Sequence, residues 1–306
     1  HVGFGYRDEA VVKDVSFVAE RGRLNFLTGE TGSGKSALAL TLAQKFDGEI
    51  IAADAMTVYK GFDIGTAKPS LQERARVPHH LLDIAEADKS FSAAQFQKRA
   101  YEAMRDIQGR GKLPILAGGS GLYVDSVLFN YTFRPRASAE LRKQLEGMSL
   151  EELHEVAWRG GFDLEAIDKH NKRRVIRLIE TSGSVVEQQP MRENTLVIGI
   201  ALERHELLKR VEQRVEAMLT AGLEQEVRLL SERYGWTVEP MKSIGYREWR
   251  AYFEGSVSQE EVRQSIVMNT MRLAKKQRTW FRRNKSIHWV HEQVEAVALV
   301  TTLLNK

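Results

Sequence analysis

The chain has 306 residues, 42% of them hydrophobic and 28% charged, which is enough for the cores of two ordinary globular domains. It has no cysteine, which excludes a disulfide framework, a cysteine-ligated zinc site and a thiol nucleophile, and which fits a reducing cytoplasm. The formal net charge of +4 permits an anionic partner without requiring one.

The first 23 residues lack the apolar core of a signal peptide, and no later run is as long as a membrane helix, so we expect a cytoplasmic protein with no membrane contact. Alternation over Val15–Val18 favours a short strand or hairpin, and we interpret the N-terminal segment that contains it, from Gly5 to Phe17, as an extra edge strand covering a sheet. The segment from Gly5 to Phe17 also resembles the opening of a transporter-type ATP-binding domain, in which an aromatic residue such as Tyr6 stacks on adenine. That resemblance ends there, because the chain has no Leu-Ser-Gly-Gly-Gln stretch and no apolar strand followed by Asp-Glu.

Residues 29–36, Gly-Glu-Thr-Gly-Ser-Gly-Lys-Ser, match the phosphate-binding pattern G-x-x-x-x-G-K-[ST]. The apolar run 24–28 predicts a strand before this loop, and residues 37–43 predict a helix after it. In that setting, backbone N–H groups and the helix N-terminus point together at a phosphate. We expect Lys35 to reach a terminal phosphate and Ser36 to bind Mg²⁺. The residues expected to hold the phosphate are Gly29, Thr31, Gly32, Ser33, Gly34, Lys35 and Ser36.

Further apolar runs at residues 49–54, 113–117 and 195–202 alternate with helical patterns. They predict an α/β fold with a P-loop-type parallel sheet and helices on both faces. Helical periodicity at residues 205–219, 223–233 and 260–283 predicts a mainly helical C-terminal third. Ligands of such sheets bind at the carboxyl ends of the strands. Lys35, Asp54 and Ser120 should therefore converge on one cleft.

Residues 131–193 differ in character, because apolar strands vanish and leucines take the spacing of short amphipathic helices among many lysines and arginines. We predict a helical insertion domain over 131–193. The P-loop-like catalytic core, with its helical C-terminal part, would then comprise residues 1–130 and 194–306.

Asp54 is the only carboxylate at a predicted strand end, because the run 113–117 ends in glycines. It has two functional interpretations, holding Mg²⁺ through water or acting as a general base on a substrate. Capping the following turn is the purely structural alternative. The pair His79-His80 could suggest a metal site with His288 or His291, but no spacing supports one, and we expect a loop role.

Six stretches, in order, are similar to the successive motifs of the tRNA dimethylallyltransferase family. They are residues 54–69, 77–84, 118–123, 211–214, 243–248 and 274–282, and the similarity extends from about residue 24 to 289. The resemblance implies transfer of a dimethylallyl group from dimethylallyl diphosphate to the exocyclic N6 amine of an adenine next to the anticodon. It also implies that Asp54 takes the amine proton and that Ser120 and Arg214 contact the diphosphate, whose charge Lys35, the loop and Mg²⁺ stabilise.

The resemblance further implies that the anticodon stem-loop of a tRNA is held by its backbone and shape while the adenine is turned out of its stack. The basic helix Arg272–Arg283 suits this task, and we expect Leu273 and Trp280 on its other face to point toward the core. The implied RNA-contacting positions are Asp54, Ala55, Met56, Thr57, Arg173, Arg174, Arg177, Lys242, Gly245, Tyr246, Arg247, Lys275, Lys276, Gln277, Arg278 and Arg282. We expect a monomer that needs no ATP.

The chain departs from the family pattern at Ala55 and Thr57, where the family usually has Ser and Gln, so a base contact by that glutamine is lost or replaced. Two alternatives stay open. One is an adenylate isopentenyltransferase of the cytokinin-forming type, which would use free AMP, ADP or ATP as the acceptor. The other is an ABC-type ATPase module of a transporter.

Overall fold

The computed structural model describes residues 4–6, 9–12, 24–133, 137–183 and 188–305. Its contacts define two compact units, each with its own core. The core unit comprises the described residues up to Leu128 and from Arg192 onward, and the small unit is Phe129–Met191. Within the described residues, no helix is long and apolar enough to cross a membrane.

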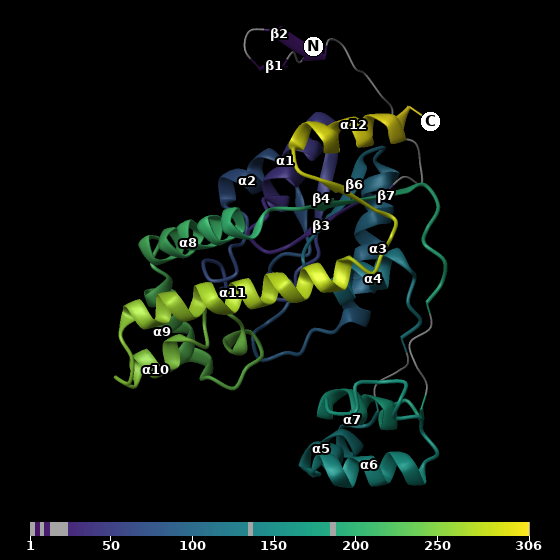
Figure 1. Cartoon of the computed structure of the whole chain (residues 1–306), viewed down its shortest axis with the longest axis vertical. Coiled ribbons are helices and arrows are strands. Elements are labelled where there is room, and N and C mark those ends of the chain that lie inside the picture. Colours follow the sequence, from purple (N-terminus) through teal and green to yellow (C-terminus); the bar gives the residue numbers. More distant parts are fainter. Residues whose placement is uncertain (1–3, 7–8, 13–23, 134–136, 184–187, 306) are drawn as a thin grey trace. The chain divides into compact units, whose positions relative to one another are not determined.

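The core unit is built on a six-stranded sheet whose order is β5-β4-β6-β3-β7-β8. Figure 1 labels four of these strands, β3, β4, β6 and β7. Every neighbouring pair is parallel, so the predicted P-loop-type α/β fold is confirmed. The central strand β3 leads directly into the phosphate loop. The strands are β3 (Leu24–Gly29), β4 (Gly48–Ala52), β5 (His79–His80), β6 (Leu113–Ala117), β7 (Thr195–Ile200) and β8 (Ile287–Val290).

Helices cover the sheet, as expected for parallel strands that are buried on both faces. Helices α1 (Lys35–Lys45) and α12 (Gln293–Leu304) join one hydrophobic cluster with alternate strand residues such as Ile115. The next residue, Leu116, is equally buried but lies outside that cluster, in keeping with the two-residue period of a strand. Helix α3 (Ala93–Gly109) packs on β4, β6 and α4 (Gly121–Leu128).

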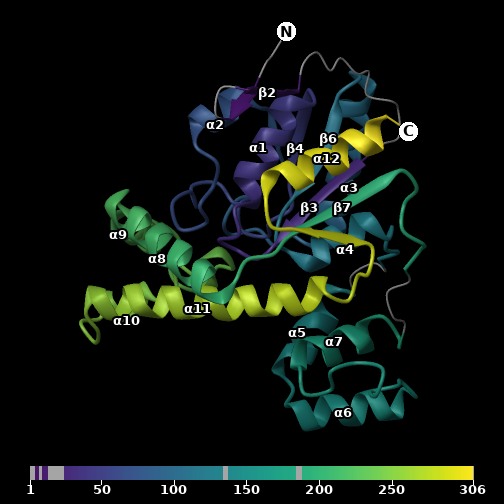
Figure 2. The ribbon, with the colours of Figure 1, turned by 45° about the horizontal axis from the view of Figure 1, so that its top comes forward.

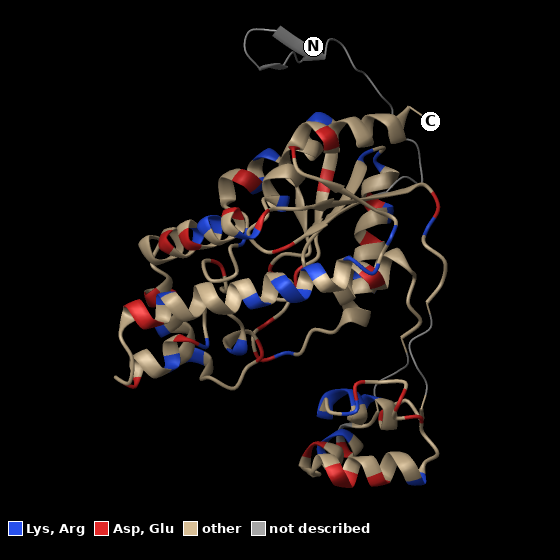
Figure 3. Ribbon diagram, viewed as in Figure 1, with Lys and Arg blue, Asp and Glu red and all other residues tan. Residues whose placement is uncertain are grey.

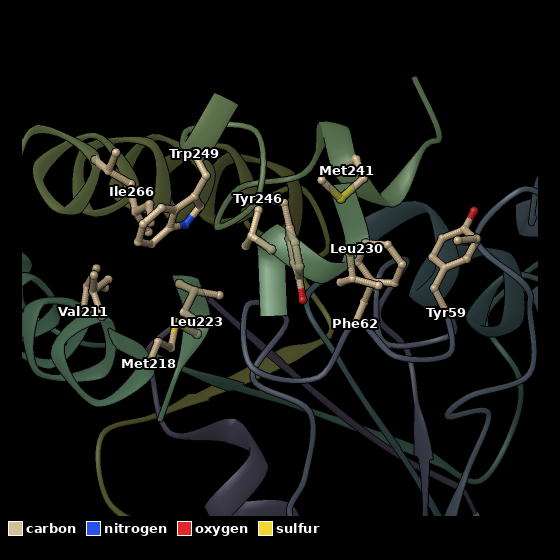
Figure 4. Close-up of a cluster of buried hydrophobic side chains, with 14 of the residues drawn as sticks. Tyr59, Phe62, Val211, Met218, Leu223, Leu230, Met241, Tyr246, Trp249 and Ile266 are labelled. Carbon is tan, nitrogen blue, oxygen red and sulfur yellow. The ribbon is translucent and has the colours of Figure 1, made fainter. Parts of the chain in front are cut away.

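The C-terminal third is mainly helical, as predicted, and the 23-residue helix α11 runs alongside α8 (Figure 2). These helices enclose a second hydrophobic cluster with the loop after β4, in which Tyr246 and Phe62 lie 5.0 Å apart between ring centroids (Figure 4). The elements are α8 (Arg204–Thr220), α9 (Leu223–Tyr234), the 3₁₀ turn η1 (Pro240–Lys242), α10 (Trp249–Phe253) and α11 (Gln259–Phe281).

The small unit contains α5 (Ala139–Gly147), α6 (Leu150–Arg159) and α7 (Lys172–Glu180). A small apolar core, with Leu145, Leu153, Val175 and Ile176 fully enclosed, holds the three helices together. Three helices of nine or ten residues are too short to be stable alone in water, so this core is what fixes them.

Several sequence-based expectations about local structure are wrong. Strands β1 (Phe4–Tyr6) and β2 (Glu9–Val12) pair with each other as a separate antiparallel sheet, so these residues supply no edge strand to the main sheet. Val15–Val18 lies outside the described residues. His79-His80 is not a loop but the edge strand β5, paired with β4. The pattern also did not reveal β8, α12 or the short helix α2 (Leu71–Arg76).

Candidate active site

The phosphate loop bends sharply between β3 and α1. Gly32 and Gly34 have φ of 85° and 92°, the left-handed region in which glycine carries no steric penalty. Ser33 donates its backbone N–H to the carbonyl of Glu30 at 3.1 Å, which closes the turn. The loop thereby delivers the chain to the N-terminus of α1, a position that favours a bound anion.

Lys35, the first residue of α1, is half-buried, and its Nζ donates to the Glu30 carbonyl at 3.2 Å. Burial and, to a smaller extent, the positive charge of Arg214 lower the pKa of Lys35 from 10.5 to about 8, against the opposing effect of Asp54 and Glu30. Two cations thus lie near one another in a poorly solvated place. A multiply charged anion would relieve their repulsion.

Helix α8 brings two arginines, one turn apart, to the phosphate loop. Arg214 donates from Nη1 to Thr31 Oγ1 at 3.2 Å, and desolvation lowers its pKa. Arg210 donates from Nη1 to the Ser33 carbonyl at 3.3 Å. The resemblance singled out Arg214 alone, whereas the four-residue spacing on one helix was a signal for Arg210 as well.

Asp54 lies just beyond the end of β4, beside the loop that follows β6. Its Oδ1 accepts a hydrogen bond from Met56 N at 2.8 Å, so it does cap the turn after the strand. Ser120 Oγ accepts a hydrogen bond from Ala55 N at 3.0 Å. A Cβ at Gly118 would lie 2.0 Å from the Ala53 carbonyl, so only glycine lets the two strand ends come this close. Ser120 therefore supports the backbone next to Asp54.

Two cavities meet beside Asp54. The loop cavity combines Lys35 and Ser36 with apolar side chains, and the basic cavity contains Lys242 and Arg247. Both are lined by the same four residues, Thr31, Asp54, Thr66 and Arg214. The apolar residues of the loop cavity are Ala39, Leu40, Ile50, Ala52, Ala67, Pro69, Leu82 and Ala117. A ligand in one cavity and a ligand in the other would thus come together at Asp54.

The residues expected to contact RNA near the basic cavity fall into two groups, those that line the cavity and those that are largely buried. Met56, Lys242, Gly245 and Arg247 line that cavity. Tyr246 is fully buried, and its hydroxyl donates to Glu226 Oε1 at 2.6 Å, so the expected RNA contact is wrong for its side chain. Of the neighbours of Asp54, Ala55 is half-buried and Thr57 is 6% exposed in the wall of the loop cavity.

Lys and Arg positions, blue in Figure 3, gather in the C-terminal half of α11, at Arg272, Lys275, Lys276 and Arg278. Lys275, Lys276 and Arg282 are exposed, with Arg282 one residue beyond the end of the helix. Gln277 and Arg278 instead point toward the phosphate loop, where Arg278 pairs with the buried carboxylate of Glu30. These two side chains therefore make contacts inside the protein, where the sequence had led us to expect contacts with RNA.

Of the two apolar residues of α11 expected to face the core, Trp280 packs against Gly121 of α4, whereas Leu273 does not face the core. Leu273 is 37% exposed and lines the basic cavity, so the prediction that it faces the core is wrong. Trp280 is half-buried and donates from Nε1 to Asp125 Oδ2 at 2.8 Å.

In the small unit, α7 buries Val175 and Ile176 on one side and exposes Arg173 and Arg174 on the other. Arg177 is half-buried and forms an ion pair with Glu180 at 3.3 Å. This helix therefore presents two unburied arginines from the predicted set.

The residues around Ser36 are compatible with a bound Mg²⁺. Ser36 is exposed in the first turn of α1 and shares the loop cavity with Asp54 and Thr31, so hydroxyl and carboxylate oxygens are at hand. In the described part of the chain, no group of three or more histidines and carboxylates could hold a metal ion.

The fold and site define a class of protein: an α/β phosphate-loop protein built to hold an anion beside a carboxylate and a second cavity. Comparison with known proteins narrows this class. The family model described as IPP transferase matches residues 57–284, and the chain belongs to that family. The predicted family is therefore confirmed.

The relatives are named for the same activity. A tRNA dimethylallyltransferase of Geobacter metallireducens is 41% identical over 303 residues, covering 93% of this chain and 97% of that protein. One from Staphylococcus epidermidis is 38% identical over 304 residues, covering 92% and 91%.

Solved structures agree. The tRNA isopentenylpyrophosphate transferase of Bacillus halodurans matches with a TM-score of 0.73 and 34% identity, covering 93% of this chain and 97% of that one. A eukaryotic dimethylallyltransferase described as acting on tRNA matches with a TM-score of 0.78 and 26% identity, covering 88% and 74%.

Proposed function

We propose that this protein transfers a dimethylallyl group from dimethylallyl diphosphate to the exocyclic N6 amine of an adenine next to the anticodon of a tRNA. The observation that carries this proposal is the meeting of the loop cavity and the basic cavity at Asp54 and Arg214. One cavity suits an anion with an apolar tail, and the other suits a base from a polyanion. The names of the relatives support the same activity.

The donor would occupy the loop cavity. Its diphosphate would lie against the phosphate loop, Lys35 and Arg214, and its five-carbon tail against the apolar wall that includes Leu40 and Leu82. When the bond between carbon and the diphosphate oxygen breaks, its electron pair stays on that oxygen. Lys35, Arg214 and the loop N–H groups then stabilise the growing negative charge. Mg²⁺ held through Ser36 would supply further charge compensation to the diphosphate.

The acceptor would enter from the basic cavity, where Lys242 and Arg247 are placed to meet the phosphates on either side of a base turned out of its stack. The amine nitrogen forms the new bond to the dimethylallyl carbon and loses one proton. Asp54, which lines both cavities, takes that proton. The products are the N6-substituted adenine and diphosphate.

The RNA would be held mainly by its phosphates. Contacts to phosphates fix the position of a nucleic acid on a protein but do not read its base sequence. Exposed cations suited to this role are Lys275, Lys276 and Arg282 on the core unit and Arg173 and Arg174 on the small unit. The insertion domain, residues 131–193, would thereby be a tRNA-contacting module. We propose a cytoplasmic monomer as the working form.

Incubation with dimethylallyl diphosphate and an unmodified tRNA tests the proposal. The wild-type protein should attach the group to one adenine beside the anticodon. Asp54→Asn should lower the rate by about 10²–10⁴-fold because the proton acceptor is lost. Asp88→Asn is the matched control, because Asp88 is exposed and pairs with its neighbour Lys89.

The alternatives predict different results. Preferential transfer to free AMP, ADP or ATP would indicate an adenylate isopentenyltransferase. Strong ATP hydrolysis without prenyl transfer would indicate a transporter ATPase module. Incorporation into tRNA that survives Asp54→Asn unchanged would refute the role given to this carboxylate.

A further inference from the structure

The side-chain amide of Gln277, on α11, bridges two loops that are far from it in sequence. Its Oε1 accepts a hydrogen bond from Thr31 N, in the phosphate loop, at 2.8 Å. Its Nε2 donates to the carbonyl of Gly119, in the loop after β6, at 2.9 Å. Both polar ends of one side chain are therefore used to tie the phosphate loop to the neighbouring strand end.

The backbone opposite Gln277 is shaped to admit it. A Cβ at Gly119 would lie 2.4 Å from Gln277 Nε2, and the three nearest atoms to that position all belong to Gln277. The same fit recurs one turn along α11, where a Cβ at Gly121 would lie 2.4 Å from the ring of Trp280. Two glycines thus make room for two side chains of α11.

The bridged residue Thr31 has a direct part in the site. Its hydroxyl accepts the hydrogen bond from Arg214, and it lines both cavities. We propose that Gln277 is a positioning residue, which sets the phosphate loop against Arg214 and does not bind RNA. This inference rests on the proposed function only in requiring that the loop binds a diphosphate.

Gln277→Ala should weaken binding of dimethylallyl diphosphate about tenfold, the effect of one or two lost hydrogen bonds on a preorganised loop. Affinity for tRNA and its dependence on salt should stay unchanged. Gln264→Ala is the matched control, because Gln264 is exposed on the same helix and donates to Glu260 within it. Calorimetric titration without RNA measures the first quantity, and filter binding over a salt series measures the second.

A second variant separates positioning from general damage to the fold. Gly119→Ala places a methyl group where the Gln277 amide lies, so it should displace that side chain and weaken diphosphate binding to the same extent. The double variant should then be no worse than either single one. Additive losses, or a loss of tRNA affinity with diphosphate binding intact, would overturn the proposal. Because the titration contains no RNA, its result stands whether or not prenyl transfer occurs.

Discussion

The lowered pKa of Lys35 makes donor binding sensitive to pH above neutrality. Burial and the nearby charge of Arg214 bring the pKa of Lys35 to about 8 in the free protein. Below that pH the ammonium group is present and attracts the diphosphate. As the pH rises through 8 the group loses its proton, so binding of dimethylallyl diphosphate should weaken.

The size of the effect follows from linkage between protonation and binding. A bound diphosphate supplies negative charge next to Lys35 and should restore its pKa toward the ordinary value of 10.5. The dissociation constant should then rise about twentyfold between pH 7.5 and 9.5, because each pH unit above the lower pKa approaches a tenfold change. The ligand contributes little to this trend, since its last phosphate proton dissociates near pH 6.

Titration calorimetry in the absence of RNA measures the trend, with two variants as references. Lys35→Arg keeps a permanent charge and should show affinity that barely changes over this range. Lys35→Met lacks the charge and should bind weakly at every pH. A flat profile for the wild-type protein, or an equal slope in Lys35→Arg, would refute the reasoning.

Two further predictions concern RNA binding and the fold. Replacing Lys275 or Arg282 by alanine should weaken tRNA binding and reduce the slope of log K against log salt by about 1, with donor binding unchanged. Filter binding over a salt series measures this slope. An unaltered slope would count against the basic helix as an RNA surface. Burial raises the pKa of Asp125 to about 6, from 3.8 in its ordinary state. Because the pKa is higher in the folded than in the unfolded protein, ionisation of Asp125 lowers the free energy of unfolding as the pH rises from about 4 through 6. Relative to the wild type, Asp125→Asn should gain about 2 kcal/mol of unfolding free energy between pH 4.5 and 7, measured by urea titration, while its amide oxygen can still accept from Trp280. A constant difference would argue against a raised pKa.

The central strands and long helices could be predicted because their signals are local. The run before the phosphate loop and the runs that became β4, β6 and β7 are continuous and apolar, as strands buried on both faces must be. Strand β8 escaped notice because Ile287–Val290 exposes His288 within a four-residue run. Strand β5 has two residues, too few for any periodicity.

The expected convergence of Lys35, Asp54 and Ser120 followed from a rule about parallel sheets and needed no knowledge of packing. Lys35 and Asp54 do line one cavity, whereas Ser120 is not among its lining residues and bonds to the backbone beside Asp54. Arg214 was placed there by family resemblance, and the structure brings it to Thr31. The burial of Tyr246 depends on how the loop after β4 packs against the C-terminal helices, which no local pattern in either segment reveals.

Arg278 shows most clearly why charge alone is a poor guide to an RNA surface. By sequence it belongs to a basic run, yet its guanidinium pairs with Glu30, which is 3% exposed, and donates to the Leu202 carbonyl at 3.0 Å. Removing the arginine would leave a buried carboxylate within the phosphate loop without its partner, a change that typically costs about 3–5 kcal/mol. Its positive charge is thus committed to holding the loop for which we propose diphosphate binding. One side of α11 supports that loop, and Lys275 and Lys276, which remain exposed, are the lysines of this helix that we propose to meet RNA.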